Sequence, residues 1–330
     1  MNTAYISKPV TSTTMWAFVV LSMTVAVAFD HEDCTRRHSA QHTMCQYMRK
    51  FGREYQDGEF EHRMQNVMHK LQHSAQSTVT VQYGLNSISD RAFVKNRFLN
   101  TQSPNTADPF RHNRLKSYKL PESLDLRDKL QPVKDQGDCG SCYTFSGVSV
   151  LEYHAGVSIS EQKIMDCSSS ENGPSYGCNG GWPENVFEYA KHWPVVLEKD
   201  MPYSAQGGPC NQTCSRSALK VLRYGSLTHE KDAESESRIP YILNTYGPVS
   251  VAIDVGTTEL LMSYQNGTFP ASACGKELDH AVTIVGYTPE QWIVRNSWSP
   301  QWGDGGYFYL ERGANACGVA EYIGYVSKTQ

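Results

Sequence analysis

Residues 136–143 read Gln-Gly-Asp-Cys-Gly-Ser-Cys-Tyr, and two shorter stretches complement them far downstream, Asp-His-Ala-Val at 279–282 and Arg-Asn-Ser-Trp at 295–298. A cysteine followed at long range by a histidine and an asparagine is the residue set of thiol-nucleophile catalysis. The sequence therefore predicts a hydrolase with a sulfur nucleophile.

Cys142 begins an apolar run whose larger side chains recur at helical spacing until Gly156. A cysteine in the first turn of a helix lies at the positive end of the backbone dipole, which favours the thiolate. The alternatives are a buried thiol, a disulfide, or a redox or zinc role for the Cys139-x-x-Cys142 pair. The sequence contains no second Cys-x-x-Cys and no evident βαβ setting around this pair. No metal or cofactor is therefore expected.

The histidine and the asparagine lie on two β-prone stretches joined by a Thr-Pro-Glu turn, which predicts a hairpin. If Tyr287 pairs with Gln291, His280 faces Trp298, and Asn296 is its diagonal neighbour on the same face. Asn296 is therefore expected to orient the imidazole ring of His280.

The start of the chain resembles a secretory leader. An uncharged apolar run covers residues 15–28 and ends in Ala-Val-Ala, which predicts a signal peptide at 1–28 cleaved near Phe29. An uncleaved anchor is the alternative, because only Lys8 supplies basic charge before the run. Secretory routing permits disulfides among the ten cysteines and N-glycosylation at the sequons of Asn211 and Asn266.

Charge divides the remaining chain into two parts. Residues 29–119 carry 14 Lys and Arg against 9 Asp and Glu, whereas residues 120–330 carry 15 against 25. These parts are net +5 and net −10, which favours docking of one on the other. The overall net charge of −4 argues against a nucleic-acid partner. Seven of the eleven histidines fall in the first part and would gain charge on acidification: His31, His38, His42, His62, His69, His73 and His112.

The basic part has its own predicted structure. Residues 56–74 place apolar side chains along one helical stripe, residues 78–83 alternate like a strand, and residues 101–108 have the composition of a linker. The histidines have the alternative interpretation of a solvated helical face.

Taken together, these motifs resemble the papain family of cysteine proteases, similar to the cathepsin L branch, with the inhibitory propeptide attached. The stretch 120–127 resembles the mature amino terminus, although Leu126 stands where tryptophan is common. The stretches 160–167, 177–183 and 298–307 resemble further family segments, and Tyr143 replaces the usual tryptophan beside the nucleophile. The propeptide match is looser and depends on two spaced motifs: Glu59, Arg63, Val67 and Lys70, then Gly84, Asn86, Ile88 and Asp90.

The resemblance implies an α+β fold with a mainly helical amino-terminal domain, a β-barrel-like carboxy-terminal domain and the active-site cleft between them. It implies a helical inhibitory propeptide at 29–119, running through the cleft, and a mature peptidase domain at 120–330.

The resemblance also implies a role for each site residue. Cys142 is expected to attack the scissile carbonyl from a resting ion pair with His280, which Asn296 orients and Trp298 shields. Gln136 is expected to bind the developing oxyanion with its side-chain amide, together with the backbone N–H of Cys142.

Three disulfides follow from the resemblance, which leaves Cys142 free. Cys214 then has no assigned partner: it is a free thiol, competes with Cys210, or pairs with Cys34 or Cys45, which could equally pair with each other. The implied pairs are Cys139 with Cys178, Cys167 with Cys210, and Cys274 with Cys317.

The resemblance further implies a substrate pocket for the residue two before the cut. Tyr322 maps onto its floor and would shorten it, which predicts small or medium aliphatic residues over large aromatic ones. A shift of one residue would instead make Glu321 an acidic floor and favour basic residues. The other positions implied are Gly180, Gly181, Trp182, Pro183, Ala252, Leu278 and Ala281.

The predicted function is a monomeric cysteine endopeptidase made as a zymogen in the secretory pathway, for an acidic vesicle, the lysosome or the extracellular space. Its expected partners are protein and peptide substrates and its own propeptide, with no stable membrane association after signal removal. The alternatives are an exopeptidase of the same family or a catalytically silent binding homologue. No histidine-rich insertion follows Trp182 to block one end of a cleft, and the four candidate catalytic residues are intact.

Overall fold

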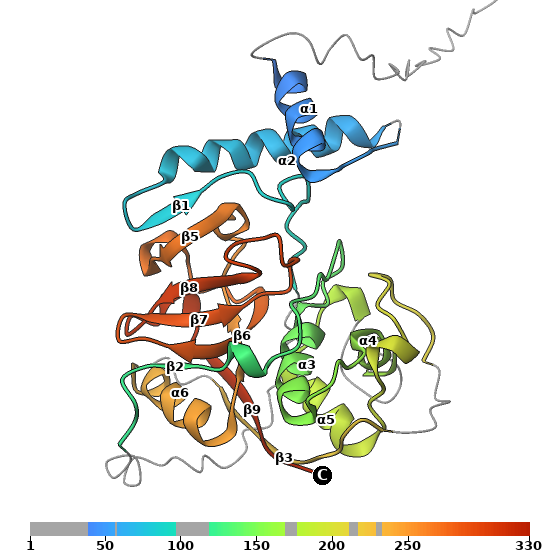
Figure 1. The fold of residues 1–330 in the computed structure, drawn as a ribbon, viewed down its shortest axis with the longest axis vertical. Coiled ribbons are helices and arrows are strands. Elements are labelled where there is room, and N and C mark those ends of the chain that lie inside the picture. The colour runs from blue at the N-terminus through green and yellow to red at the C-terminus, as the bar shows by residue number, and fades with distance from the viewer. Residues whose placement is uncertain (1–38, 57, 97–118, 169–176, 211–216, 229–232) are drawn as a thin grey trace, which may run out of the picture.

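The computed structural model describes residues 39–56, 58–96, 119–168, 177–210, 217–228 and 233–330. Within residues 119–330 a helical part lies beside a sheet part, and an amino-terminal segment lies across one end of the sheet part (Figure 1). This arrangement is the α+β fold predicted from the sequence. None of the helices in these ranges is long and apolar enough to cross a membrane. Several predicted features lie outside the described residues: the leader at 1–28, the linker at 101–108, the sequon at Asn211, Cys34 and Cys214, and His31, His38 and His112.

The helical part is built around one buried helix, α3 (Cys142–Ala155), which is covered by α4 (Glu161–Ser168) and α5 (Pro183–His192). Gly147 allows the close approach of α3 and α5, because a Cβ there would lie 2.6 Å from the Cβ of Val186. Apolar side chains from all three helices form the core of this part. The predicted helix after Cys142 is confirmed, and it begins at the cysteine itself.

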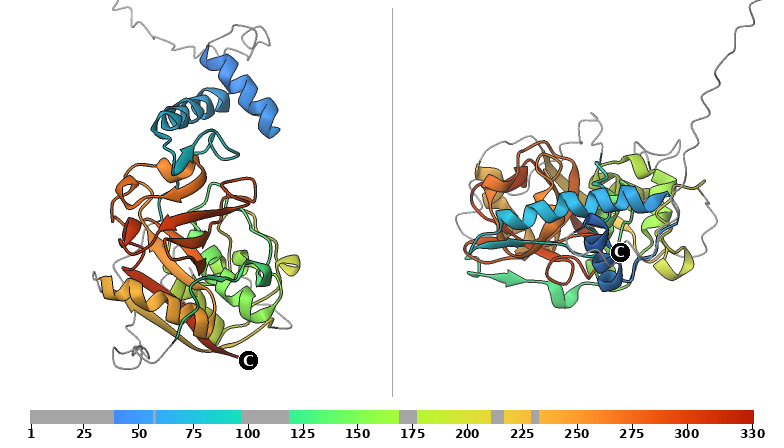
Figure 2. Two further views of the ribbon diagram at one scale, coloured as in Figure 1. Left: turned by 60° about the vertical axis from the view of Figure 1, so that its left-hand side comes forward. Right: turned by 90° about the horizontal axis from the view of Figure 1, so that it is seen from above.

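The sheet part is formed by short strands in the order β1-β5-β8-β7-β6-β4-β9-β3, with β2 paired to β6, and β1 (Val81–Tyr83) comes from the amino-terminal segment. Its apolar core includes Val251, Ile284, Trp292 and Phe308, and the long β3–β9 ribbon connects it to the helical part (Figure 2). The helix α6 (Ala233–Tyr246) covers its outer side. The strands are β2 (Leu124–Asp125), β3 (Val221–Thr228), β4 (Val249–Ile253), β5 (Tyr264–Phe269), β6 (His280–Tyr287), β7 (Gln291–Arg295), β8 (Tyr307–Glu311) and β9 (Tyr322–Thr329).

The predicted hairpin is β6 followed by β7, but its predicted register was wrong beside the turn. Tyr287 pairs with Trp292 rather than with Gln291. An irregularity between Ile284 and Gly286 then shifts the pairing by one residue, so that Thr283 pairs with Arg295. A β-bulge of this kind adds one residue to one strand only. The register beyond it is the predicted one, which brings His280 toward Trp298.

The amino-terminal segment has a small core of its own. Helix α2 (Glu59–His73) matches the predicted apolar stripe, whereas α1 (Ala40–Phe51) was not predicted; together they bury Met44, Tyr47 and Val67. The strand β1 (Val81–Tyr83) pairs with β5 and is shorter than predicted, because Thr78 forms a turn by accepting the N–H groups of Thr80 and Val81. The segment is thereby joined to the sheet part.

Candidate active site

The candidate nucleophile lies where the helical and sheet parts meet. Cys142 is the first residue of α3 and is fully buried, and within the described residues it is the free cysteine. Its Sγ accepts the backbone N–H of Ala281, the second residue of β6, at 3.3 Å. The hydroxyl of Ser146, one turn further along α3, donates to the Val282 carbonyl at 2.7 Å. The sulfur is therefore held directly beside the strand that begins with His280.

His280 is fixed by its neighbours across the hairpin. Its Nε2 lies 2.8 Å from Asn296 Oδ1, and since that oxygen only accepts, Nε2 carries the proton. The Trp298 ring stacks on the imidazole with centroids 4.7 Å apart. Within the described residues, the buried Nδ1 of His280 has no hydrogen-bond partner. The imidazole is thus oriented so that Nδ1 is the nitrogen available to accept a proton.

The buried surroundings favour the neutral forms of both groups. Burial raises the pKa of the Cys142 thiol to about 12, although the N–H of Ala281 acts in the opposite direction. Burial also lowers the pKa of His280 to about 4, against the effect of its hydrogen bond to Asn296. The resting ion pair expected from the resemblance is therefore disfavoured at this buried site. Admission of solvent to the site would lower the cost of charging both groups.

Gln136 lies on the loop that precedes α3 and is almost fully buried. Its Oε1 accepts the Ser297 hydroxyl at 2.6 Å, and its Nε2 donates one hydrogen to the Cys139 carbonyl at 2.9 Å. Its backbone N–H donates to the Ser297 carbonyl at 2.8 Å. The residue that follows Asn296 therefore fixes the Gln136 side chain, although the sequence alone gave Ser297 no role.

The residues expected to line the substrate pocket come from both parts. The Trp182 ring lies against the ring of Tyr322 at 4.9 Å, and Ala252 pairs with Ala281 between β4 and β6. Pro183 begins α5 directly after Trp182, and Leu278 precedes β6. Tyr322 is almost fully buried, and its hydroxyl lies above Gly324, where a Cβ would approach it to 2.6 Å.

The amino-terminal segment covers these residues. The Phe93 ring is edge-on to His280 and to Trp298, at 6.2 and 6.4 Å between centroids. Asn96 donates its side-chain amide to the Gly181 carbonyl at 3.1 Å and accepts the Gly181 N–H at 2.9 Å. Its own N–H donates to the Asp279 carbonyl at 2.9 Å. Phe93 and Asn96, which the sequence motifs did not single out, thus bridge the helical and sheet parts over Cys142.

Among the described residues, four ion pairs join the amino-terminal segment to the rest of the chain, and each has the same polarity. The basic partner always comes from the amino-terminal segment and the acidic partner always from residues 120–330, as the charge imbalance predicted. The pairs are Arg63 with Asp138 at 3.2 Å, Lys70 with Glu259 at 3.1 Å, Arg91 with Asp135 at 2.7 Å, and Lys95 with Asp279 at 3.5 Å.

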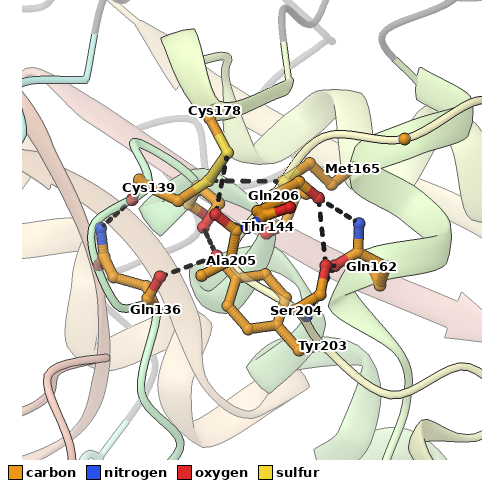
Figure 3. Close-up of a disulfide and its surroundings, with 12 residues drawn as sticks. Gln136, Cys139, Thr144, Gln162, Met165, Cys178, Tyr203, Ser204, Ala205 and Gln206 are labelled. Carbon is orange, nitrogen blue, oxygen red and sulfur yellow. Dashed lines mark hydrogen bonds between the residues drawn. A yellow bond between two sulfur atoms is a disulfide. The ribbon is translucent and has the colours of Figure 1, made fainter.

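Three disulfides have both cysteines among the described residues, and they are the pairs that the resemblance implied: Cys139–Cys178, Cys167–Cys210 and Cys274–Cys317. The first fixes the loop that carries Gln136 (Figure 3). Cys45 is disulfide-bonded as well. In the part of the chain that the structure describes, no three His, Cys, Asp or Glu side chains gather as a metal site.

Comparison with known proteins gives one consistent result. The model of the family described as papain family cysteine protease matches residues 120–327. Pro-cathepsin H of Mus musculus is 33% identical over 302 residues, which cover 84% of this chain and 88% of that protein.

Solved structures of precursors are similar over nearly the same length. Procathepsin L 3 of Tenebrio molitor larval midgut has a TM-score of 0.73 at 29% identity and covers 88% of this chain and 99% of that one. Recombinant stem bromelain precursor has a TM-score of 0.73 at 26% identity, with coverage of 87% and 98%.

Proposed function

The chain belongs to the papain family of cysteine proteases and is a zymogen, and on that basis we propose that it is an endopeptidase that cuts within protein and peptide substrates. The observation that carries this proposal is the meeting of Cys142 Sγ with the N–H of Ala281 at 3.3 Å, next to an imidazole that Asn296 orients. Nucleophile, base and orienting group are the parts that acyl transfer by a thiol requires.

In the proposed mechanism the uncovered Cys142 thiolate attacks the scissile carbonyl carbon and forms a C–S bond. His280 gives its proton to the leaving amine as the C–N bond breaks, which leaves a thioester on the enzyme. His280 then takes a proton from water, the water attacks the thioester, and the acid product leaves as the thiol is restored. The backbone N–H of Cys142 and the second hydrogen of Gln136 Nε2 bind the oxyanion in both steps.

The propeptide would inhibit by occupying the substrate's place. An extended peptide bound beside Gly181 would use the same backbone N–H and carbonyl that Asn96 occupies. Phe93 additionally screens His280 and Trp298. We propose residues 29–119 as this inhibitory propeptide and residues 120–330 as the mature enzyme, released from a precursor whose residues 1–28 form a signal peptide.

We propose that the pocket beside Trp182 accepts small or medium aliphatic residues two positions before the cut. Tyr322 fills the space between Trp182 and Gly324, so little depth is left for a large aromatic side chain. Glu321, the alternative floor, is only partly buried. If Glu321 formed the floor of the pocket, its negative charge would select basic side chains.

An acidic compartment of the secretory route or the extracellular space suits this precursor. The apolar leader, the disulfides and the exposed sequon at Asn266 support that route. Glycosylation is proposed at Asn266 and, outside the described residues, at Asn211.

The test is acid treatment of the purified precursor and of its Cys142→Ala variant, followed with internally quenched peptides blocked at both ends. Wild-type precursor should gain activity as it is shortened, and the variant should stay inactive. Equal activity from both proteins would refute Cys142 as the nucleophile. Cleavage only of peptides with a free amino or carboxyl terminus would replace the endopeptidase proposal with an exopeptidase.

A further inference from the structure

The loop at residues 136–141 holds the proposed oxyanion donor at one end and the residue before the nucleophile at the other. On its outer side, Cys139 is disulfide-bonded to Cys178, and the Gly140 N–H donates to the Cys178 carbonyl at 2.8 Å. These contacts hold the middle of the loop. They do not fix the distance between Gln136 and Ser141.

One hydroxyl group, from Tyr203, joins those two ends, and Figure 3 shows Tyr203 beside Gln136. Tyr203 Oη lies 2.8 Å from the Gln136 carbonyl oxygen and 2.5 Å from Ser141 Oγ. Because a carbonyl only accepts, the single phenolic hydrogen goes to Gln136, and the Ser141 hydroxyl therefore donates to Tyr203. Ser141 precedes α3, yet its side chain makes no capping hydrogen bond to the helix. Its hydroxyl is hydrogen-bonded to Tyr203 instead.

Tyr203 is itself held from several sides. The ring meets Phe145 of α3 edge-on, with centroids 4.8 Å apart and planes at 86°. Its backbone N–H donates to Glu198 Oε1 at 3.0 Å. The next residue, Ser204, donates from both its N–H and its hydroxyl to Gln162 Oε1 of α4, at 2.9 and 3.0 Å. The tyrosine is therefore a fixed point to which the loop is tied.

We propose that Tyr203 is a positioning residue for oxyanion binding, acting through the Gln136 main chain and the Ser141 hydroxyl. The proposal rests on the proposed peptidase function and assigns a role to a residue outside the Cys-His-Asn set. The hydrogen bond from Tyr203 fixes the main chain of Gln136, and the hydrogen bond from Ser297 fixes the Oε1 atom at the end of its side chain. Together they place the side-chain amide. Catalytic groups displaced by about 1 Å can cost up to 10² in rate.

The test compares mature wild-type enzyme with Tyr203→Phe, which keeps the ring and removes the hydroxyl. We expect kcat to fall about tenfold while KM changes less than twofold, as for an interaction made only in the transition state. Binding of a peptide aldehyde, whose adduct with Cys142 carries an oxygen at the oxyanion position, should weaken by a similar factor. Alkylation of Cys142 by iodoacetamide develops no oxyanion, and its rate should stay within twofold of wild type.

Two further variants separate positioning from general damage. In a Gln136→Ala background, adding Tyr203→Phe should cause a much smaller loss, because the side-chain donor that the tyrosine positions is then gone. Tyr189→Phe is the matched control: it also removes a tyrosine hydroxyl bonded to a carbonyl, that of Pro194 in the same helical part, and should leave kcat unchanged.

An unchanged kcat in Tyr203→Phe, or a parallel fall in kcat and alkylation rate, would overturn the proposal. So would a tenfold further loss in the Gln136→Ala background. If Tyr203→Phe does not fold, Ser141→Ala removes one of the two hydrogen bonds and should give the same pattern with a loss of about threefold. Failure of the peptidase function itself is distinguishable, since wild-type enzyme would then show no Cys142-dependent cleavage.

Discussion

The side-chain amide of Asn96 forms a closed pair of hydrogen bonds with the backbone of Gly181, donating to its carbonyl at 3.1 Å and accepting its N–H at 2.9 Å. An amide side chain carries the donor and acceptor of a peptide group on one carbon. Asn96 can therefore take the place of a substrate backbone while its own main chain bonds to Asp279 on the other side.

Replacing this asparagine should open the precursor. Each hydrogen bond contributes about 0.5–1.5 kcal/mol net, so Asn96→Ala should raise access to Cys142 about tenfold. The measurement is the rate of iodoacetamide alkylation of the intact precursor at neutral pH. Asn244→Ala, which loses contacts to Pro240 and Tyr287 at a distance from the propeptide, should keep the wild-type rate. Equal rates for Asn96→Ala and wild type would contradict the assigned blocking role.

The ion pair of Arg91 with Asp135 should set part of the acid response. Burial raises the pKa of Asp135, but the Arg91 guanidinium outweighs it and holds the pKa below its usual value. A carboxyl group with a lowered pKa contributes stability that is fully present above its usual pKa of about 3.9 and is lost as the pH falls from there through the lowered value. At pH 5.5 this ion pair is therefore intact in the wild-type precursor, and Arg91→Gln, which lacks it, should activate about tenfold faster at that pH.

Arg63→Gln is the control for that variant, because its partner Asp138 is about half exposed. Exposed ion pairs contribute about 0–1 kcal/mol, so its activation rate should rise much less. Activation is followed as the appearance of peptidase activity over time. A wild-type pH profile in Arg91→Gln would show that this ion pair does not hold the precursor closed.

His73 should weaken the contact of the propeptide with the sheet part at a higher pH than Asp135 does. Burial lowers the pKa of His73, and His69 and Lys70 lower it further, against the opposite effect of Glu259. Its Nδ1 lies 2.7 Å from Ser263 Oγ, where α2 meets the sheet part. Because the neutral ring is favoured, its contribution is present above the usual pKa of about 6.5 and is lost as the pH falls from there toward the lowered value.

Hydrogen exchange of the Cys142→Ala precursor tests that response. In this background, the backbone amides of α2 should exchange faster at pH 5 than at pH 7 after correction for intrinsic rates. His73→Gln should reduce this difference between the two pH values. His62→Gln, an exposed change on the same helix, should leave it intact. An identical pH response in the His73→Gln protein would exclude this histidine as a sensor.

The Tyr322 side chain should decide the size of the pocket beside Trp182. Tyr322→Ala removes the ring that contacts Trp182 at 4.9 Å and should increase the ratio of kcat/KM for phenylalanine over valine, two residues before the cut, by about tenfold. Paired fluorogenic peptides give this ratio. Glu321→Ala should not change it, and loss of a preference for arginine in that variant would instead identify Glu321 as the pocket floor.

A buried charge cluster behind the candidate site should matter for stability. Lys134 Nζ lies 2.8 Å from Glu152 and 2.8 Å from Glu161, and both carboxylates are almost fully buried. Lys134→Met would leave them without this cation, at a cost of about 3–5 kcal/mol, which lowers the thermal midpoint by about 10 °C. Lys191→Met, at an exposed pair with Glu188, should shift the midpoint by no more than about 3 °C. Scanning calorimetry of the two variant precursors measures these midpoints. Similar midpoints for Lys134→Met and Lys191→Met would contradict a large contribution of the buried cluster to stability.

Much of the fold could be predicted because its signals are local. The apolar spacing after Cys142 and along residues 56–74 indicated two helices, observed as α3 and α2, and the β-prone stretches around Thr288-Pro289-Glu290 indicated the hairpin of β6 and β7. Helix α1 escaped prediction because its buried side, Met44, Cys45 and Tyr47, is short, and these side chains are buried only because α1 packs on α2.

The sequence by itself determined which residue types the site contains, their order, and the opposite charges of the two parts of the chain. Tertiary structure alone decided the rest. The bulge between Ile284 and Gly286 corrects the hairpin register, burial raises the pKa of Cys142 and lowers that of His280, and Tyr203 ties the Gln136 loop together. The physical reason is that burial and hydrogen-bond partners depend on residues far apart in the chain, which no local pattern encodes.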